Sequence, residues 1–301
     1  MFPTSVARAY ALAQQAPPAD PVAAAAATRK QMAATPIEVT KLTDALTMLS
    51  GPGGNVVVLT GRDGKVVVDT FIQGAFAPLK QRLDAMGNAP ILYVIDTHWH
   101  FDHADNNESF RKADAAIIAH ENTRKRLSEP HDLLGMHFNP SPAGALPTQT
   151  FAQSHTLKLN GEQVDLAHVP PAHTDTDITV HFTRGNVLHM GDLFFNGMYP
   201  FIDASTRGNI NGMIAAADRA LKLVNAATRI VPGHGPLADR GALTRYRDVL
   251  VTVRDRVATL KKAGRTEKEV VAAKPTADLD PAWGKGFMMP DVFVGIVYNT
   301  L

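Results

Sequence analysis

Residues 97–103 read Thr97-His98-Trp99-His100-Phe101-Asp102-His103 and follow directly on the apolar run of residues 90–95. The run has the length and composition of a buried β-strand, so the three histidines and the aspartate lie where that strand ends. Imidazole suits zinc, copper, iron and nickel, and a carboxylate adds an oxygen ligand. A histidine-rich surface loop is the alternative, but the appended Asp102-His103 argues against it. The stretch predicts a catalytic transition-metal site.

The spacing inside this stretch suggests more than one metal ion. Alternate side chains of an extended segment point the same way, which places His98, His100 and Asp102 on one side. His103 must then reach the site from a turn beyond them. Four ligands this close are too crowded to serve one ion well, so we expect them to divide between two.

Three later loops each follow a predicted strand and each offers a ligand: His173, Asp192 and His234. Side chains on such loops can converge at one edge of a sheet while the scaffold holds them still. Glycine beside Asp192 and on both sides of His234 permits tight turns close to a ligand. Each signal alone is weak, and the joint occurrence with the first cluster is what makes these residues candidate ligands.

Strand and helix patterns alternate along the rest of the chain. Residues 55–60 and 65–69 flank Arg62-Asp63-Gly64, which predicts a β-hairpin. Helical spacing marks residues 76–86, 104–113, 121–127, 210–224 and 243–262. Two successive halves that run from strands to helices indicate an α/β fold, with two sheets packed together and helices outside. Residues 129–148 hold too many proline and glycine residues for regular structure, and we hypothesise that they cover the site.

Composition limits the remaining possibilities. The chain has 301 residues, of which 45% are hydrophobic, and its net charge of +1 gives no electrostatic reason to expect nucleic acid as a partner. No apolar run approaches a membrane span, so membrane insertion is not expected. The absence of cysteine excludes disulfides, thiolate ligands and cysteine nucleophiles. A small-molecule substrate is the expected partner.

The amino terminus differs from the rest. Residues 1–35 are rich in alanine and proline and have no face to bury, so we interpret them as a disordered leader or the remnant of a signal peptide. This interpretation favours a periplasmic or secreted protein, with a cytoplasmic one as the alternative. Residues 36–301 are expected to form a single domain.

The combined motif resembles the metallo-β-lactamase-fold hydrolases over about residues 37–236. The resemblance implies a four-layer αββα sandwich with two divalent metal ions, usually zinc. On this pattern His98, His100 and His173 hold the first metal, Asp102, His103 and His234 hold the second, and Asp192 bridges both. Two such ions can share a hydroxide that attacks a substrate carbonyl. Asp102 could orient that hydroxide or accept its proton, which makes it the candidate catalytic residue.

The chain departs from the best-known lactamases of that family. They carry cysteine where this sequence has Asp192, and lysine where it has Phe195. Hydrolysis of an acyl or lactone carbonyl, in an ester or thioester, is therefore expected, with β-lactams as a side activity. The alternatives are a glyoxalase II-like or phosphodiester hydrolase, and a periplasmic accessory metalloprotein with little hydrolysis. Di-iron members usually have glutamate in place of His100, which disfavours that branch.

Further candidates lie near the ligands in sequence. Phe194, Phe195 and Tyr199 follow Asp192 and suggest an apolar wall for the substrate, and His137 in residues 129–148 is a further substrate-binding candidate. Asp69 and Asp96 end strands ahead of the first cluster, where they could orient ligand histidines.

Overall fold

Two β-sheets form the centre of the protein in the computed structural model, which describes residues 20–301. The first sheet has the order β1-β2-β3-β4-β5-β6-β9. Its strands are β1 (Glu38–Lys41), β2 (Leu46–Ser50), β3 (Asn55–Leu59), β4 (Lys65–Val68), β5 (Ile91–Ile95), β6 (Ala116–His120) and β9 (Gln149–Phe151). The second sheet has the order of the sequence: β10 (Ser154–Leu159), β11 (Glu162–His168), β12 (Ile178–Phe182), β13 (Val187–His189) and β14 (Arg229–Val231). The predicted hairpin of residues 55–69 is confirmed as the antiparallel pair β3–β4.

The apolar pattern of β3 explains why the sheets are stacked. Every residue of this strand is buried, because both of its faces are covered. Val57 and Leu59 belong to the core between the sheets, together with Val180 and Phe182 of β12. Val56 and Val58 point the other way and belong to the core beneath the outer helices. The chain thus forms the predicted αββα sandwich.

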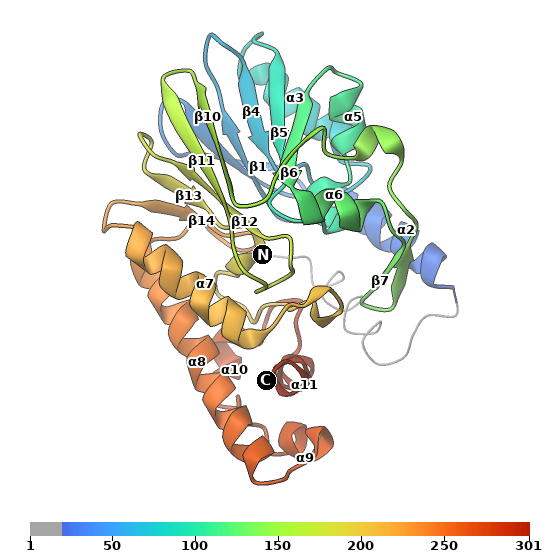
Figure 1. Ribbon diagram of the computed structural model, residues 1–301, viewed down its shortest axis with the longest axis vertical. Helices are drawn as coiled ribbons and strands as arrows, with labels where there is room; N and C mark the ends of the chain where they lie inside the picture. Colours follow the sequence, from blue (N-terminus) through green and yellow to red (C-terminus); the bar gives the residue numbers. More distant parts are fainter. Residues whose placement is uncertain (1–19) are drawn as a thin grey trace.

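Helices cover the outer face of each sheet (Figure 1). Those by the first sheet are α3 (Phe76–Ala85), α4 (Phe101–Ala104), α5 (Asn107–Arg111) and α6 (Glu121–Leu127). Those by the second sheet are α7 (Ile210–Leu223) and α8 (Arg240–Lys262), and α9 (Glu267–Ala272), α10 (Asp280–Trp283) and α11 (Pro290–Asn299) follow. Within the predicted helix over residues 104–113 the structure has only the short helix α5, because α4 ends at Ala104 and the chain turns at Asp105 and Asn106.

Strand direction brings the candidate loops to one edge of the sandwich. β4, β5 and β6 run parallel, so their carboxyl ends meet at the same edge of the first sheet. In the second sheet β13 and β14 are parallel, and β11 and β13 are both antiparallel to β12. The segments that leave β5, β11, β13 and β14 carry all seven candidate ligands.

The interpretation of residues 1–35 as a disordered leader is wrong for residues 20–35. A helix, α2 (Pro21–Ala33), begins at Asp20, whose carboxylate accepts hydrogen bonds from two backbone N–H groups of the first turn. Ala25 and Met32 are buried, and Arg29 forms a bidentate ion pair with Asp105 at 2.7 and 2.8 Å. The sequence pattern does not reveal this helix, because a run of alanine residues shows no apolar face and the ion-pair partner of Arg29 is distant in sequence. The predicted signal remnant falls mainly on residues 1–19, which lie outside the described residues.

The prediction that residues 129–148 lack regular structure is also wrong. β7 (His131–Leu133) and β8 (Met136–Phe138) pair as a hairpin. Leu134 and Gly135 between them have φ values of 53° and 76°, as a two-residue turn requires. The proline residues lie outside the paired strands, so they leave room for this short hairpin.

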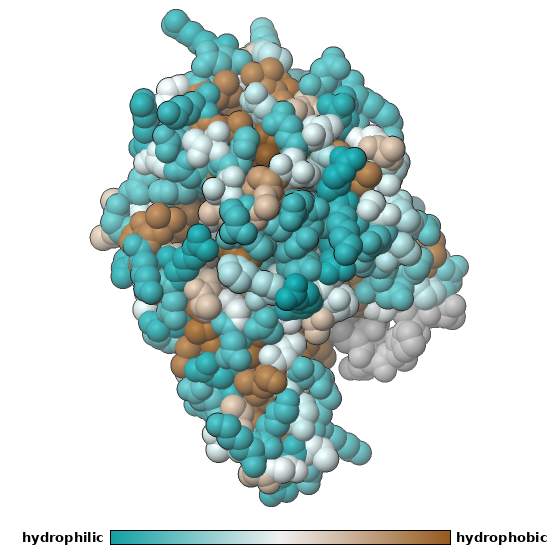
Figure 2. Space-filling model, viewed as in Figure 1, coloured by the Kyte–Doolittle hydropathy of each residue, from teal (hydrophilic) through white to brown (hydrophobic). Residues whose placement is uncertain are grey.

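The surface gives no sign of a membrane-spanning helix in the described part of the chain. Among residues 20–301, none of the helices has both the length and the apolar character needed to cross a bilayer. The face shown in Figure 2 is mainly hydrophilic, with apolar side chains in small scattered groups.

His120, at the end of β6, predicts a pH dependence of stability. Its Nδ1 accepts a hydrogen bond from Asn122 N–H at the start of α6, and its ring stacks on His168 with centroids 3.8 Å apart. Burial, followed by the charge of His168, lowers the pKa of His120. The unfolded chain, with an ordinary histidine pKa of about 6.5, therefore binds the proton more readily.

Stability from neutral His120 is complete above about pH 6.5 and decreases as pH falls below that value. We expect His120→Asn to lose less unfolding free energy than the wild type between pH 7.5 and 5.5, in urea titrations at equal metal content. Identical losses in the two proteins would show that His120 does not contribute.

Candidate metal centre

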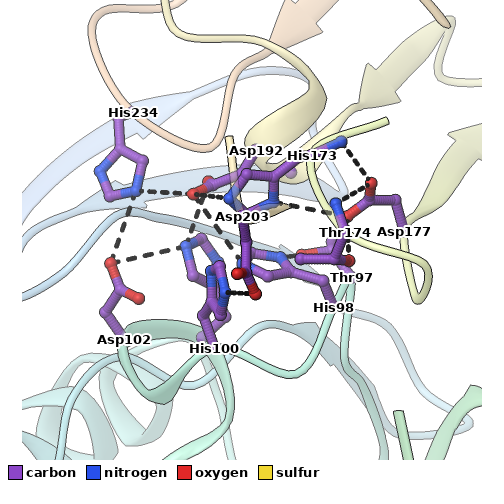
Figure 3. Close-up of polar contacts among 12 residues, drawn as sticks. Thr97, His98, His100, Asp102, His173, Thr174, Asp177, Asp192, Asp203 and His234 are labelled. Atoms are coloured by element: carbon purple, nitrogen blue, oxygen red, sulfur yellow. Dashed lines mark hydrogen bonds and ion pairs between the residues drawn. The ribbon is translucent and has the colours of Figure 1, made fainter. Parts of the chain in front are cut away.

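Short segments at the strand ends hold the seven candidate ligands (Figure 3). After β5 the chain enters α4, for which His100 is the N-cap, and the first turn contains Asp102 and His103. Asp192 lies in the 3-10 helix η2 (Gly191–Leu193), directly after β13. His173 and His234 lie in the loops after β11 and β14.

The seven side chains form two groups, each with ligand atoms within 4.8 Å of one another, and all seven are buried. The first group is His98, His100, His173 and Asp192, and the second is Asp102, His103 and His234. The structure thus brings together every residue proposed as a ligand from the sequence, with Asp192 grouped with His98, His100 and His173.

Asp192 contacts both groups. Its Oδ1 lies 3.2 Å from His103 Nε2, and its Oδ2 lies 3.3 Å from His234 Nε2 in the second group. The same Oδ2 is 3.7 Å from His173 Nε2 and 3.8 Å from His98 Nε2 in the first group. In Figure 3 this carboxylate lies between His234 and the other histidines. A carboxylate in this position could join two cations and offset their repulsion.

The donor atoms fit metal ions. The Nε2 atoms of His98, His103 and His173 and Oδ1 of Asp192 are buried and have no hydrogen-bond partner within residues 20–301. Buried polar atoms without partners are costly, and a bound cation would satisfy all four. Imidazole and carboxylate, without thiolate, suit several divalent metals.

Electrostatics act in opposite directions on the histidines of the cluster. Burial alone would lower the pKa of His103, but the Asp192, Asp102 and Asp69 carboxylates outweigh it and hold that pKa well above its usual value, so this imidazole must lose a proton to bind a metal. Burial holds the pKa of His98 well below its usual value, which leaves this imidazole neutral and able to donate a lone pair. Burial alone would raise the pKa of Asp192, but the neighbouring charges of His234 and His103 outweigh it and hold that pKa well below the usual range. Asp192 is therefore an anion, as a metal ligand must be.

Neighbouring oxygen atoms fix the orientation of the three imidazoles of residues 97–103. His103 Nδ1 is 2.8 Å from Asp69 Oδ2, and His98 Nδ1 is 3.1 Å from Thr97 Oγ1, so both rings present Nε2 to the site. His100 is turned the other way, since its Nε2 lies 3.3 Å from Asp203 Oδ2 and its Nδ1 is left for a metal.

Two orienting carboxylates were missed in the sequence. Asp203 is buried and accepts hydrogen bonds from Ser205 and Thr206, and Asp177 Oδ1 lies 3.4 Å from His173 Nδ1. Asp177 also accepts from the backbone N–H of His173, so its place four residues after a ligand was a usable signal. Nothing in the local sequence marks Asp203.

Asp69 contacts a ligand histidine, as predicted for an orienting carboxylate, whereas Asp96 does not. Asp96 Oδ2 instead accepts a hydrogen bond from Asn107 Nδ2 at 2.8 Å, and within residues 20–301 Asp96 forms no hydrogen bond with a ligand histidine. Burial holds the pKa of Asp96 well above the usual carboxyl value, so its surroundings disfavour the charged form.

The four proposed substrate-binding residues all contact other parts of the protein. Phe194 packs on Tyr246 of α8, and Tyr199 stacks on Phe293 of α11 and donates a hydrogen bond to Asp280. Both rings are enclosed by carboxyl-terminal helices that the motif does not reveal. His137 Nδ1 lies 2.7 Å from Asp132 Oδ1 on the paired strand.

Two other side chains of the β7–β8 hairpin contact the metal-binding segment. His131 packs on Trp99, and Phe138 stacks on Phe101 with ring centroids 4.9 Å apart. The fourth proposed residue, Phe195, stacks on His234 with centroids 5.0 Å apart, but it is completely enclosed. It therefore supports a ligand and has no surface for a substrate.

Gly233, directly before His234, leaves no room for a side chain. A Cβ atom there would lie 2.0 Å from Asp192 Oδ1 and 2.6 Å from the carbonyl carbon of Gly191. We expect Gly233→Ala to reduce metal content and to lower the unfolding free energy by about 3 kcal/mol, because the backbone of η2 must move. Metal analysis and chemical denaturation measure both effects.

Gly241→Ala is the matched control for Gly233→Ala. Its Cβ would approach only the ends of the Asp239 and Arg245 side chains closely, at 3.3 and 3.4 Å. Its metal content should equal that of the wild type. Normal metal content in Gly233→Ala would contradict the close approach of Gly233 to Asp192.

An αββα sandwich with seven histidine and aspartate side chains gathered at one edge defines a class of metallohydrolases. The family model of the metallo-beta-lactamase superfamily matches residues 49–234, well over half of the chain. The chain belongs to this superfamily, and it is a metal-dependent hydrolase by class.

Solved structures share the fold at low sequence identity. A metallo-beta-lactamase from Pontibacter korlensis has a TM-score of 0.60 at 20% identity, over 71% of this chain and 99% of that one. The DIM-1 metallo-beta-lactamase has a TM-score of 0.58 at 18% identity, over 72% and 99%. A sec-alkylsulfatase from Pseudomonas sp. has a TM-score of 0.67 at 16% identity, over 97% of this chain and 54% of that one. A search of curated proteins gave no match.

Proposed function

We propose that this protein uses two divalent metal ions, with zinc as the first choice, to hydrolyse an acyl or lactone carbonyl in a small molecule. The observation that carries the proposal is the Asp192 carboxylate, whose two oxygens contact histidines of both ligand groups. One carboxylate shared by two sets of ligands is suited to hold two ions close together.

When bound, the ions would supply an activated water and stabilise negative charge on the substrate. His98, His100 and His173 would hold the first ion, Asp102, His103 and His234 the second, and Asp192 both. Asp69 and Asp203 keep the protons of His103 and His100 on the nitrogen that faces away from the site.

Asp102 is the best placed group to accept a proton. It keeps 9% of its surface exposed, more than any other proposed ligand. Its Oδ2 lies 3.5 Å from His234 Nε2 and 3.8 Å from His103 Nε2, so it borders the second group on the open side. A carboxylate there can orient a water molecule and receive its proton.

The surroundings favour an uncharged acyl group. Aromatic rings of Phe201 and Phe287 lie within about 6 Å of the proposed ligand histidines His100 and His234, with a centroid separation of 5.9 Å in each pair. An ester, thioester or lactone matches such a wall better than an anionic phosphodiester does. β-Lactams are a side activity in this proposal, since Asp192 and Phe195 replace the family's cysteine and lysine.

Metal analysis combined with a substrate panel tests this function. The panel contains an ester, a lactone, a thioester, a β-lactam and a phosphodiester, and the alkylsulfatase neighbour adds a secondary alkyl sulfate. We expect two metal ions per chain and fastest turnover of an ester, thioester or lactone. Two bound ions without turnover of any substrate would instead support an accessory metalloprotein. Fastest turnover of the phosphodiester or the sulfate would contradict an acyl substrate and identify that compound's class as the substrate.

A further inference from the structure

The proposed ligands differ in how much surface they keep, and this identifies the open side of the site. His98, His103 and His173 are completely enclosed. Asp102, Asp192, His234 and His100 retain a little exposure, with relative values of 9%, 5%, 4% and 3%. A substrate can therefore approach the ligands from the side on which these four residues lie.

Two aromatic rings border this open side and belong to different parts of the chain. The ring of Phe201 is 5.9 Å from that of His100 and 6.1 Å from that of His173, both in the first ligand group. The ring of Phe287 is 5.9 Å from that of His234, in the second group. Phe201 is half-buried, and Phe287 keeps 7% of its surface.

The two rings differ in exposure, since Phe201 is only partly buried, whereas Phe287 keeps 7% of its surface and belongs to the hydrophobic core. Phe195 also contacts His234, but it has no exposed surface. The ring of Phe287 is 5.9 Å from that of Phe195 and 5.9 Å from that of His234, so the three rings contact one another. Phe287 and Phe201 therefore lie beside ligands that themselves face the opening.

The segment that carries Phe287 is fixed beside the site by backbone contacts. Tyr199 N–H donates a hydrogen bond to the Trp283 carbonyl at 3.1 Å. Gly286 lies so close to Met198 that an added Cβ would be 2.7 Å from the Met198 Cβ. The residues after 234 lie outside the family match, so this chain supplies Phe287 from its own carboxyl-terminal part.

We propose that Phe201 and Phe287 form the two sides of an acyl-binding groove and select substrates with an apolar chain long enough to contact both rings. The proposal rests on the proposed function, because the reacting carbonyl must lie at the ligand groups that these rings flank. Each ring would exclude water from a different side of the acyl chain. The substrate class is thus a medium-chain ester or thioester.

The test compares p-nitrophenyl octanoate with p-nitrophenyl acetate. In the wild type we expect kcat/KM to favour the octanoyl ester. Phe201→Ala and Phe287→Ala should each lower the ratio of octanoyl to acetyl kcat/KM by about tenfold, since each removes one apolar wall. Phe201→Leu and Phe287→Leu keep an apolar side chain and should restore most of the ratio.

Two control variants separate selectivity from structural damage. Phe195→Leu alters an enclosed ring on the same ligand, so it should change both substrates alike and leave the ratio within about twofold. Leu223→Ala removes an exposed apolar side chain at the end of α7, far from the ligands in sequence, and should also leave the ratio unchanged. Unchanged ratios in both phenylalanine-to-alanine variants, with wild-type metal content, would overturn the groove.

A binding measurement keeps the groove testable if the proposed function fails. Octanoate and acetate share a carboxylate and differ only in the apolar chain, so calorimetry on metal-loaded protein isolates the contribution of the chain. We expect octanoate to bind at least about tenfold more tightly, and each alanine variant to reduce that preference. Equal affinities in the wild type would refute the groove even where esters are hydrolysed, and a retained preference without any hydrolysis would refute only the function.

Discussion

Asp192→Asn is expected to lower kcat by more than about a hundredfold and to leave fewer than two metal ions per chain. Residues that only orient a metal ligand are typically worth about 10- to 100-fold in metal affinity or activity, so loss of a direct ligand shared by two ions should cost more. The variant keeps the shape of the side chain, and it removes the negative charge that contacts His103 and His234. Metal analysis and steady-state kinetics on the best substrate of the panel measure both effects.

Asp44→Asn is the control for this change. Its carboxylate is fully exposed and, within residues 20–301, pairs with Lys41 on the surface, so metal content and kcat should match the wild type. Activity of Asp192→Asn near the wild-type level, with two metal ions still bound, would remove the bridging role of Asp192.

Asp203→Asn is expected to weaken the first metal position by about 10- to 100-fold. Burial alone would raise the pKa of Asp203, but the hydrogen bond from His100, followed by those from Ser205 and Thr206, lowers it. The anion therefore holds the proton of His100 on Nε2 and leaves Nδ1 for the metal. An amide can present its NH₂ group instead, which removes this preference.

The measurement for Asp203→Asn is metal affinity by competition with a chelator, together with the visible spectrum of the cobalt-substituted protein. A changed ligand orientation alters the cobalt spectrum, whereas a loss of stability alone does not. Asp132→Asn is the matched control, because Asp132 pairs with His137, a histidine that contacts no proposed ligand in the described contacts. Wild-type affinity and spectrum in Asp203→Asn would show that Asp203 does not position His100.

Local sequence determined much of the fold. Four consecutive apolar residues in β3 indicate a strand that is buried on both faces. In the structure Val57 faces the other sheet and Val56 faces the helices. The hairpin around Asp63-Gly64 follows from turn chemistry that needs no tertiary contact. Periodicity could not identify α2, because a run of alanine has no amphipathic pattern and the ion pair between Arg29 and Asp105 joins residues 76 positions apart.

The convergence of the seven candidate ligands was predictable for a similar reason. Metal coordination requires specific atoms, so His98, His173, Asp192 and the others keep recognisable residue types in recognisable places after strands. Their neighbours are less constrained. Asp203 reaches His100 across 103 residues, and any carboxylate that folds to this point could do the same.

The sequence by itself determined which atoms can bind metal, because those atoms must have particular chemistry. Only the tertiary structure decided which aromatic residues face the opening. Phe194, Phe195 and Tyr199 lie next to Asp192 in sequence and are enclosed by α8, α11 and the segment before it, whereas Phe287 is distant in sequence and lies beside His234. Exposure depends on what packs over a side chain, and that packing comes from parts of the chain that no local pattern connects to the metal site.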